Sequence, residues 1–206
     1  DKRAARIRAL FAGVVLGVLV FSNFYLWTAA LAWLFCVCLL WILFRRSDWR
    51  RVLSVMITIA SITAIALGPY VYLVLHRAAS LDEQQSLIST HRPELLRIPE
   101  ILGAVILIAI GMAVRRKKIE LNDSRLIFTA SLSLLPFAVF NQQVITGWIM
   151  QPYHYEVFIL NYSVLVAVFT AVQLLQNPVP RRLLIWIVTL SVAWGFIEVN
   201  VPARLT

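Results

Sequence analysis

The side chains best suited to chemistry in this sequence lie close together, between Asn141 and Glu156. The stretch reads NQQVITGWIMQPYHYE, and it supplies amides, phenols, an imidazole and a carboxylate where ordinary connections use small turn-forming residues. Amide and phenol groups suit neutral polyhydroxyl ligands, because a sugar hydroxyl both donates and accepts hydrogen bonds. Aromatic faces pack against the C–H face of a sugar or against a prenyl chain. We therefore predict a substrate-binding segment made of Asn141, Gln142, Gln143, Gln151, Tyr153, His154, Tyr155 and Glu156.

Charged groups that could act on a ligand lie within this segment and in an earlier polar connection. His154 and Glu156 are two residues apart, so they share a side of an extended segment but diverge on a helix. As a pair they could perform acid–base catalysis, and the imidazolium could bind a pyrophosphate. Arg92 and Arg97 could bind an anionic phosphate through charge-assisted hydrogen bonds. The alternative for all of these residues is structural, since Tyr anchors helices at the membrane surface and amides satisfy neighbouring helices.

No strong catalytic or metal-binding motif accompanies these residues. The sequence has no phosphate-binding glycine loop, no HExxH and no nucleophile elbow. Cys36 and Cys38 stand in an apolar run without His or Cys partners, which indicates small apolar fillers and neither a metal site nor a disulfide. The sequence therefore identifies no catalytic residue, no metal ligand and no cofactor of its own.

Composition places these residues in a membrane protein. Hydrophobic residues make up 61% of the chain and charged residues 14%, whereas soluble domains contain about 25% charged residues. Fifteen of the nineteen Lys and Arg residues fall into four clusters, at 2–8, 45–51, 115–125 and 181–182, which are separated by apolar runs. Clusters of this kind flank the cytoplasmic ends of membrane spans, so they do not indicate nucleic-acid binding.

The apolar runs predict an all-α, polytopic helical bundle that forms a single transmembrane domain. The first run, 9–44, holds 36 uncharged residues, which is too long for one crossing, and it has basic residues on both sides. We predict a hairpin of two short helices there; the alternative is one strongly tilted helix. About seven spans follow from the pattern, with outer loops at 76–98 and 144–156: 9–22, 26–44, 52–75, 99–114, 126–143, 157–176 and 183–199.

The arrangement of charges also predicts an orientation. With the basic clusters in the cytoplasm, the N-terminus lies inside, the C-terminus lies outside, and the polar segment faces the outer side of a bacterial inner membrane. Gly68-Pro69 is expected to kink or end the third span near the outer boundary. Because the chain opens at Asp1 in a basic flank and ends just after an apolar run, we interpret it as a fragment of a larger membrane protein.

Two parts of the sequence suggest a family. Residues 21–29 (FSNFYLWTA), and residues 141–147 (NQQVITG) with 151–156 (QPYHYE), resemble bacterial multi-pass proteins of the GT-C glycosyltransferase type. Such proteins transfer a sugar from a polyprenyl-phosphate donor at the outer face of the membrane. The resemblance implies that this chain supplies lipid- and sugar-contacting parts, since the family's catalytic acidic residue sits in a first outer loop that has no counterpart here. It also implies a polyprenyl-phosphate sugar and membrane lipid as partners, and it allows a divalent metal in the full-length protein.

Two other functions fit the same sequence. A carrier or flippase for a lipid-linked or small polar solute would also need polar groups in the membrane, although polar groups gathered on one side argue mildly against alternating access. A non-catalytic scaffold subunit of an envelope-synthesis complex would need only anchoring residues. The transferase is the leading hypothesis, and the sequence leaves the oligomeric state open.

Overall fold

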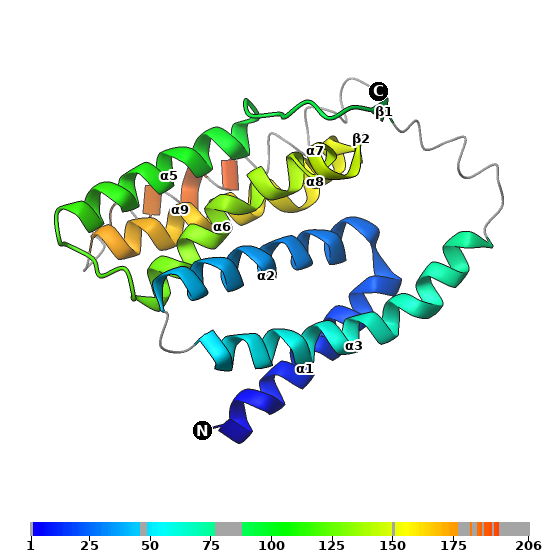
Figure 1. Ribbon diagram of the computed structural model, residues 1–206. Coiled ribbons are helices and arrows are strands. Elements are labelled where there is room, and N and C mark those ends of the chain that lie inside the picture. The colour runs from blue at the N-terminus through cyan, green and yellow to red at the C-terminus, as the bar shows by residue number, and fades with distance from the viewer. Residues whose placement is uncertain are drawn as a thin grey trace.

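The computed structural model describes residues 2–45, 49–76, 88–149 and 151–176, and separately residues 182, 185, 186, 188–190, 192 and 193. Within these residues six helices are long and apolar enough to cross a membrane, which confirms the all-α bundle and makes the chain a multi-pass membrane protein. The predicted seventh span, 183–199, lies largely outside the described residues. The six helices contain α1 (Lys2–Ser22), α2 (Phe24–Phe44), α3 (Trp49–Leu75), α5 (Ile98–Arg115), α6 (Ser124–Phe140) and α9 (Asn161–Leu175) (Figure 1).

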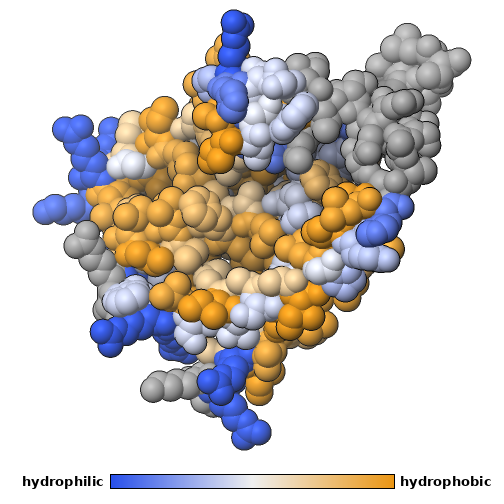
Figure 2. All heavy atoms as spheres, turned by 45° about the vertical axis from the view of Figure 1, so that its right-hand side comes forward, coloured by the Kyte–Doolittle hydropathy of each residue, from blue (hydrophilic) through white to orange (hydrophobic). Residues whose placement is uncertain are grey.

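Successive helices run in opposite directions, so three of the basic clusters come together at one end of the bundle (Figure 1). We call this the basic end, and it contains the starts of α1, α3 and α6 and the ends of α2 and α5. The opposite end, which we call the polar end, contains the turn between α1 and α2 and the segments 88–97 and 141–155. Figure 2 shows a face on which hydrophobic residues cover the middle and the most hydrophilic residues lie toward the edges, as a bilayer requires.

The first apolar run forms the predicted hairpin, but its helices are not short. α1 and α2 contain 21 residues each, or about 31 Å, which matches the thickness of the hydrocarbon layer. A single tilted helix is excluded, and α1 extends back to Lys2, so it includes the basic cluster at its start. The turn is made by Asn23, whose side-chain oxygen accepts hydrogen bonds from the N–H groups of Tyr25 and Leu26 and thereby caps α2.

α3 ends at Leu75, where the third predicted span ends. It continues through Pro69, so Gly68-Pro69 does not end the span, because a helix of 27 residues tolerates the one hydrogen bond that proline removes. The connection after α6 is largely ordered as α7 (Gln143–Thr146), β2 (Trp148–Ile149) and α8 (Pro152–Tyr155). α8 continues into a π-helical segment, η2 (Glu156–Leu160), and then into α9, so this apolar helix begins at Pro152 rather than near residue 157. Proline suits that first helical position, where no N–H is needed.

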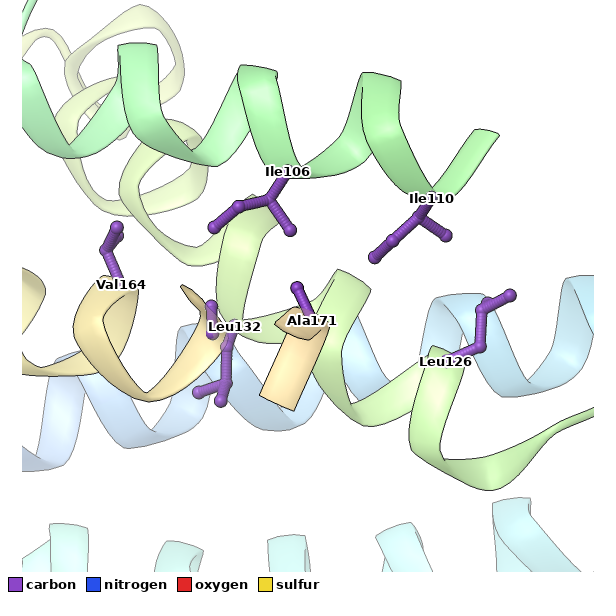
Figure 3. Packing of buried hydrophobic residues seen from close by; sticks show 7 residues of the cluster. Ile106, Ile110, Leu126, Leu132, Val164 and Ala171 are labelled. Atoms are coloured by element: carbon purple, nitrogen blue, oxygen red, sulfur yellow. The ribbon is translucent and has the colours of Figure 1, made fainter. Parts of the chain in front are cut away.

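The helices α5, α6 and α9 pack around a shared hydrophobic core. Ile106 and Ile110 of α5 lie against α6 and α9, which contribute Leu126, Leu132, Val164 and Ala171 (Figure 3). α5 and α6 approach closely at Gly103, where a Cβ atom would lie 2.4 Å from the backbone oxygen of Ser133. This group of helices carries the segments 88–97 and 141–155 at its polar end.

The helices α1 and α3 form a separate pair. Gly13 of α1 faces α3 so closely that a Cβ atom would lie 2.7 Å from Ile62 Cδ1. Nearer the polar end, the rings of Phe21 and Tyr70 meet edge to face at 6.4 Å. α2 lies between this pair and α6 (Figure 1), so it connects the two groups of helices.

Candidate functional site

The segment 88–97 lies across the polar end and is held there by its backbone. β1 (Ile88–Ser89) pairs antiparallel with β2, and the Thr90 N–H donates to the carbonyl oxygen of Gly147 at 3.0 Å. The His91 ring packs on Gly147, and its Nδ1 lies 3.2 Å from the carbonyl oxygen of Val144. Gly147 has a φ of 76°, the left-handed conformation that ends α7 and that favours glycine. The segment 88–97 and the connection after α6, which are far apart in the sequence, therefore pack against each other.

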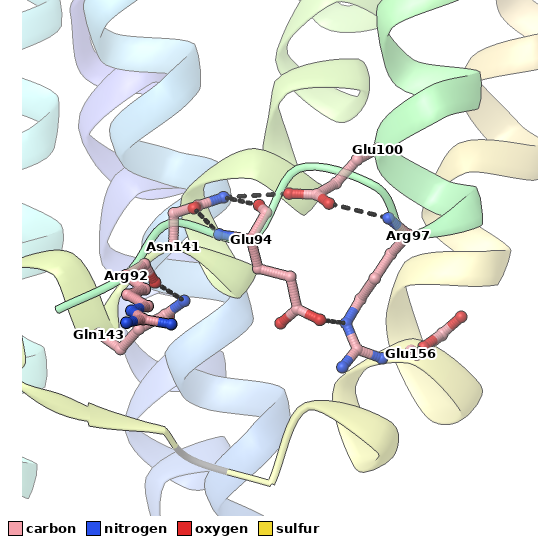
Figure 4. A network of polar contacts seen from close by, with 7 residues as sticks. All are labelled: Arg92, Glu94, Arg97, Glu100, Asn141, Gln143 and Glu156. Carbon is pink, nitrogen blue, oxygen red and sulfur yellow. Dashed lines mark hydrogen bonds and ion pairs between the residues drawn. The ribbon is translucent and has the colours of Figure 1, made fainter. Parts of the chain in front are cut away.

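Asn141 is at the centre of the side-chain contacts that join these connections. Its Oδ1 accepts a hydrogen bond from the Glu94 N–H at 2.8 Å, and its Nδ2 donates to the Glu94 carbonyl oxygen at 2.8 Å (Figure 4). The same Nδ2 donates to Glu100 Oε1 at 3.0 Å. Gln143 is buried and donates from Nε2 to the carbonyl oxygen of Arg92 at 3.2 Å. These two amides fasten the segment 88–97 to α6 and α7, because they satisfy backbone groups that form no helix or sheet.

Arg97 lies between two carboxylates. Its Nη1 is 2.6 Å from Glu156 Oε2, and its Nε is 2.7 Å from Glu94 Oε1. The guanidinium also lies over the Phe140 ring, with Cζ 4.9 Å from the ring centroid. Burial disfavours the charged guanidinium, but hydrogen bonds to Glu156 and Glu94 outweigh burial, so the pKa of Arg97 is raised above its usual value. A phosphate at Arg97 would therefore compete with both carboxylates.

Glu100 also belongs to this network, although it is not among the binding residues predicted from the sequence. It is 0% exposed, which is unusual for a carboxylate at the start of a membrane helix. Its Oε2 accepts a hydrogen bond from the Arg97 N–H at 3.1 Å, and its Oε1 accepts the bond from Asn141. The sequence contained a signal for this role. An acid at the third position of a helix that has Pro99 in its first turn is typical of a capping carboxylate.

A second polar cluster joins α8 to the beginning of α2. The rings of Tyr25 and His154 stack with centroids 5.0 Å apart and an interplanar angle of 4°. The Tyr25 hydroxyl donates to Gln151 Oε1. The hydroxyl groups of Thr28 and Tyr155 lie 2.7 Å apart, and Tyr155 is buried. The cluster therefore brings the beginning of α2 together with α8, two parts far apart in the sequence.

Residues 152–160 are helical, so the side chains of His154 and Glu156 point in different directions. His154 stacks on Tyr25 and Glu156 pairs with Arg97, so the two residues contact different neighbours and do not form an acid–base pair. His154 Nδ1 is buried and has no hydrogen-bond partner among the described residues. The π-helical turn that follows is a conformation often found at functional sites.

The structure thus distributes the predicted binding residues between two groups. The network around Asn141 takes in Gln143, Arg97 and Glu156 through their side chains and Arg92 through its backbone. The cluster around Tyr25 contains four more of the predicted residues, Gln142, Gln151, His154 and Tyr155. Gln142 is hydrogen-bonded to the Tyr155 hydroxyl. Tyr153 belongs to neither group. The side chains of Arg92 and Tyr153 are exposed.

An apolar groove begins one helical turn from the cluster around Tyr25. It has a volume of about 400 Å³ and lies mainly between α2, α6 and α9. Ala29 in the lining is one turn from Tyr25, and Ile159 is one turn from Tyr155. Trp33, also in the lining, donates from Nε1 to a serine of α6, so its polar atom is satisfied. The groove therefore presents hydrocarbon surface directly beside a polar cluster.

Among the described residues, no group of three or more His, Cys, Asp or Glu is arranged to hold a metal ion. The described site offers a ligand hydrogen bonds, aromatic ring faces and hydrocarbon contact. No protein-family model, no curated protein and no solved structure matches this chain.

Proposed function

We propose that this chain binds a polyprenyl-phosphate-linked sugar at its polar end and supplies the lipid- and sugar-contacting part of a membrane-embedded glycosyltransferase. The observation that carries the proposal is the position of the apolar groove beside the stacked rings of Tyr25 and His154. A lipid-linked sugar needs two adjoining surfaces of opposite character, one for the hydrocarbon chain and one for the polar head. These surfaces adjoin at the start of α2 and at η2.

The orientation in this proposal follows the positive charge. The basic end faces the cytoplasm, which places the N-terminus inside and the polar end at the outer surface of a bacterial inner membrane. A seventh crossing by residues 183–199 then leaves the C-terminus outside. The donor lipid lies in the outer leaflet, beside the groove formed by α2, α6 and α9.

The polar residues have different roles in this proposal, according to the partners they already have. His154 Nδ1 has no described partner, so it is the group best placed to hydrogen-bond a phosphate or a sugar hydroxyl. Arg97 is neutralised by two carboxylates and acts as a positioning residue. Arg92, whose side chain is exposed, is the better candidate for contact with the donor phosphate.

Equilibrium binding of radiolabelled polyprenyl phosphate to the purified protein tests the use of the groove. Val166 is 45% exposed and lines the groove, so Val166→Trp should fill it and weaken binding at least tenfold. Ile65 is 75% exposed on α3, outside the groove, so Ile65→Trp is the matched control and should bind like the wild type. Equal affinities for the two variants would rule out the groove as the lipid site.

Sugar transfer by the full-length protein tests the polar cluster. His154→Ala and Gln142→Ala should each reduce the glycolipid product, because both change groups in the cluster around Tyr25. Leu96→Ala is the control, since this side chain is 85% exposed and is not among the predicted binding residues. Unchanged product in the first two variants would remove these residues from the site.

A second candidate function is a non-catalytic scaffold subunit of an envelope-synthesis complex. It is favoured by the network in which Arg97 is ion-paired with Glu156, and Glu100 and Asn141 are hydrogen-bonded, within the protein. A scaffold should co-purify with protein partners and should bind polyprenyl phosphate no better than a lipid of similar length without a phosphate. The binding measurement therefore separates the two functions.

A further inference from the structure

A hollow of about 650 Å³ lies between α1 and α3 at the basic end, at the opposite end of the bundle from the site described above. Its entrance carries Arg3 and Arg6 from α1 and Arg50 and Arg51 from α3. Ala9 and Val55 line it farther along the two helices, toward the middle of the bundle. The volume is within the range of about 300–1,000 Å³ that is typical of small-molecule sites.

The packing of α1 against α3 explains why the hollow exists. The helices are in tight contact at Gly13 and Ile62, where the missing side chain of glycine lets the backbones approach. Toward the basic end the two helices separate (Figure 1), and the small Ala9 leaves space between them. The hollow is therefore closed toward the middle of the bundle and open at the surface.

The charge of the hollow is positive. No carboxylate is present among its described lining residues, and the nearest acidic residues in the sequence, Asp1 and Asp48, lie outside the described residues. Gathering several guanidinium groups around one space is unfavourable unless an anion neutralises them. A phosphate is the anion that guanidinium groups bind best, because their planar donors match its oxygens.

The surroundings of the hollow indicate the source of that phosphate. The hollow opens where a membrane span begins, and its inner lining combines Ala9 and Val55 with the hydroxyl residues Ser54 and Thr58 of α3. The Thr58 hydroxyl donates to the Ser54 carbonyl oxygen within α3 at 2.9 Å. The Arg50 guanidinium lies 5.5 Å from the centroid of the Trp49 ring, and Trp is the residue that prefers the headgroup level of a bilayer. Basic pockets between membrane helices bind anionic headgroups at this depth. A soluble anion would make no use of the hydrocarbon surface of Ala9 and Val55 in the hollow.

We infer that this hollow binds the phosphate headgroup of an anionic phospholipid, with Arg6, Arg50 and Arg51 contacting the phosphate and the acyl chains following α1 and α3. This inference does not depend on the proposed function, because the hollow shares no residue with the groove or with the polar end.

Native mass spectrometry of the purified protein, titrated with phosphatidylglycerol, tests the inference. The variant Arg6→Gln/Arg50→Gln/Arg51→Gln should bind phosphatidylglycerol at least tenfold more weakly than the wild type. The matched control is Arg115→Gln/Arg116→Gln/Lys117→Gln, which removes the same charge from the end of α5 and should leave affinity unchanged. Arg6→Lys/Arg50→Lys/Arg51→Lys keeps the charge and should retain most of the binding, which shows that the glutamine variant has not simply failed to fold.

Three outcomes would overturn the inference. Equal losses in the α1/α3 variant and in the α5 control would mean that the lipid responds only to overall charge. Equal binding of phosphatidylcholine with the same acyl chains would mean that no anionic headgroup is recognised. Displacement of phosphatidylglycerol by millimolar inorganic phosphate would identify a site for a soluble anion instead of a lipid.

Discussion

The two ends of this bundle use their charged residues in opposite ways. At the polar end, Arg97 contacts two carboxylates, and the fully buried Glu100 accepts two hydrogen bonds. At the basic end, Arg50 and Arg51 are exposed and line a hollow that has no carboxylate among its described residues. The charges of Arg97 and Glu100 therefore act within the protein, whereas those of Arg50 and Arg51 face the membrane surface.

The contrast between Glu100 and the exposed arginines predicts where a change of charge should affect stability and where it should affect only binding. A buried carboxylate that loses its partners carries the full cost of desolvation. An exposed arginine at the headgroup level keeps its solvation and can exchange water for a lipid phosphate. We therefore expect substitutions in the network around Asn141 to destabilise the fold most, and substitutions of the exposed Arg50 and Arg51 to leave it intact.

The largest effect is expected from Glu100→Ala. It leaves the Arg97 N–H and the Asn141 amide without their acceptor in a fully buried position, which should cost about 3 kcal/mol. Glu100→Gln is the control, because it keeps one acceptor oxygen and should cost about 1 kcal/mol. The free energy of unfolding in mixed micelles measures both, and a stability of Glu100→Ala within 0.5 kcal/mol of the wild type, about the scale of a neutral surface change, would contradict the network.

The next effect is the coupling between Arg97 and Glu156. Both side chains are largely buried, at 25% and 21% exposure, so a double-mutant cycle with Arg97→Met and Glu156→Gln should give a coupling of about 1–2 kcal/mol. The comparison pair is Arg125 and Asp123 at the basic end, where Arg125 is 66% exposed. That cycle should give a smaller coupling. Equal couplings would remove the distinction between the two ends.

A smaller effect is expected at Asp123, which caps α6. Its Oδ1 accepts a hydrogen bond from the Arg125 N–H at 2.9 Å, so Asp123→Ala should cost about 1 kcal/mol. The Arg125 side chain lowers the pKa of Asp123 below its usual value. The stabilisation is therefore complete above the unfolded-state pKa and is lost as pH falls through the lower folded-state pKa. Asp123→Asn retains a capping group, so the free energy of unfolding should lose this pH dependence while most of the capping remains.

The smallest effect on stability is expected at Arg50 and Arg51. Their side chains are exposed, so Arg50→Gln/Arg51→Gln should change the free energy of unfolding by no more than about 0.5 kcal/mol per residue in a lipid-free detergent. Thermal unfolding followed by circular dichroism measures this. A loss comparable to that of Glu100→Ala would show that the arginines of the basic end are structural after all.

Hydropathy and charge clusters predicted most of the fold. The first six predicted spans correspond to helices, because about 20 apolar residues and their basic flanks are local properties of the chain. Boundaries were less predictable. α3 ends at Leu75 as predicted, but it passes through Pro69, where a kink or an end was expected. The next helix after β2 begins at Pro152 rather than near residue 157, because proline suits the first turn of a helix in a way that composition does not reveal.

The candidate site was predicted as a set of residues but not as a set of contacts. The segment 141–156 was recognisable because polar side chains are concentrated there in an apolar chain. The contact of Arg97 with Glu156, and that of Tyr25 with Gln151, join residues far apart in the sequence, so local patterns could not predict them. Glu100 was missed because a single acid at the start of a span looks like an ordinary flanking charge until Asn141 is seen beside it.

Photocrosslinking in the membrane is the most direct way to test whether the groove between α2, α6 and α9 binds polyprenyl phosphate. Tyr162 lies in the groove and is 61% exposed, and Ile65 is 75% exposed on α3, so both positions face lipid. A benzophenone amino acid would replace each residue in turn, in membranes that contain a trace of radiolabelled polyprenyl phosphate. If the groove binds the lipid, a labelled adduct should form at position 162 and little or none at position 65. Equal labelling at the two positions would contradict it, because the groove would then hold the lipid no better than any other exposed surface of the bundle.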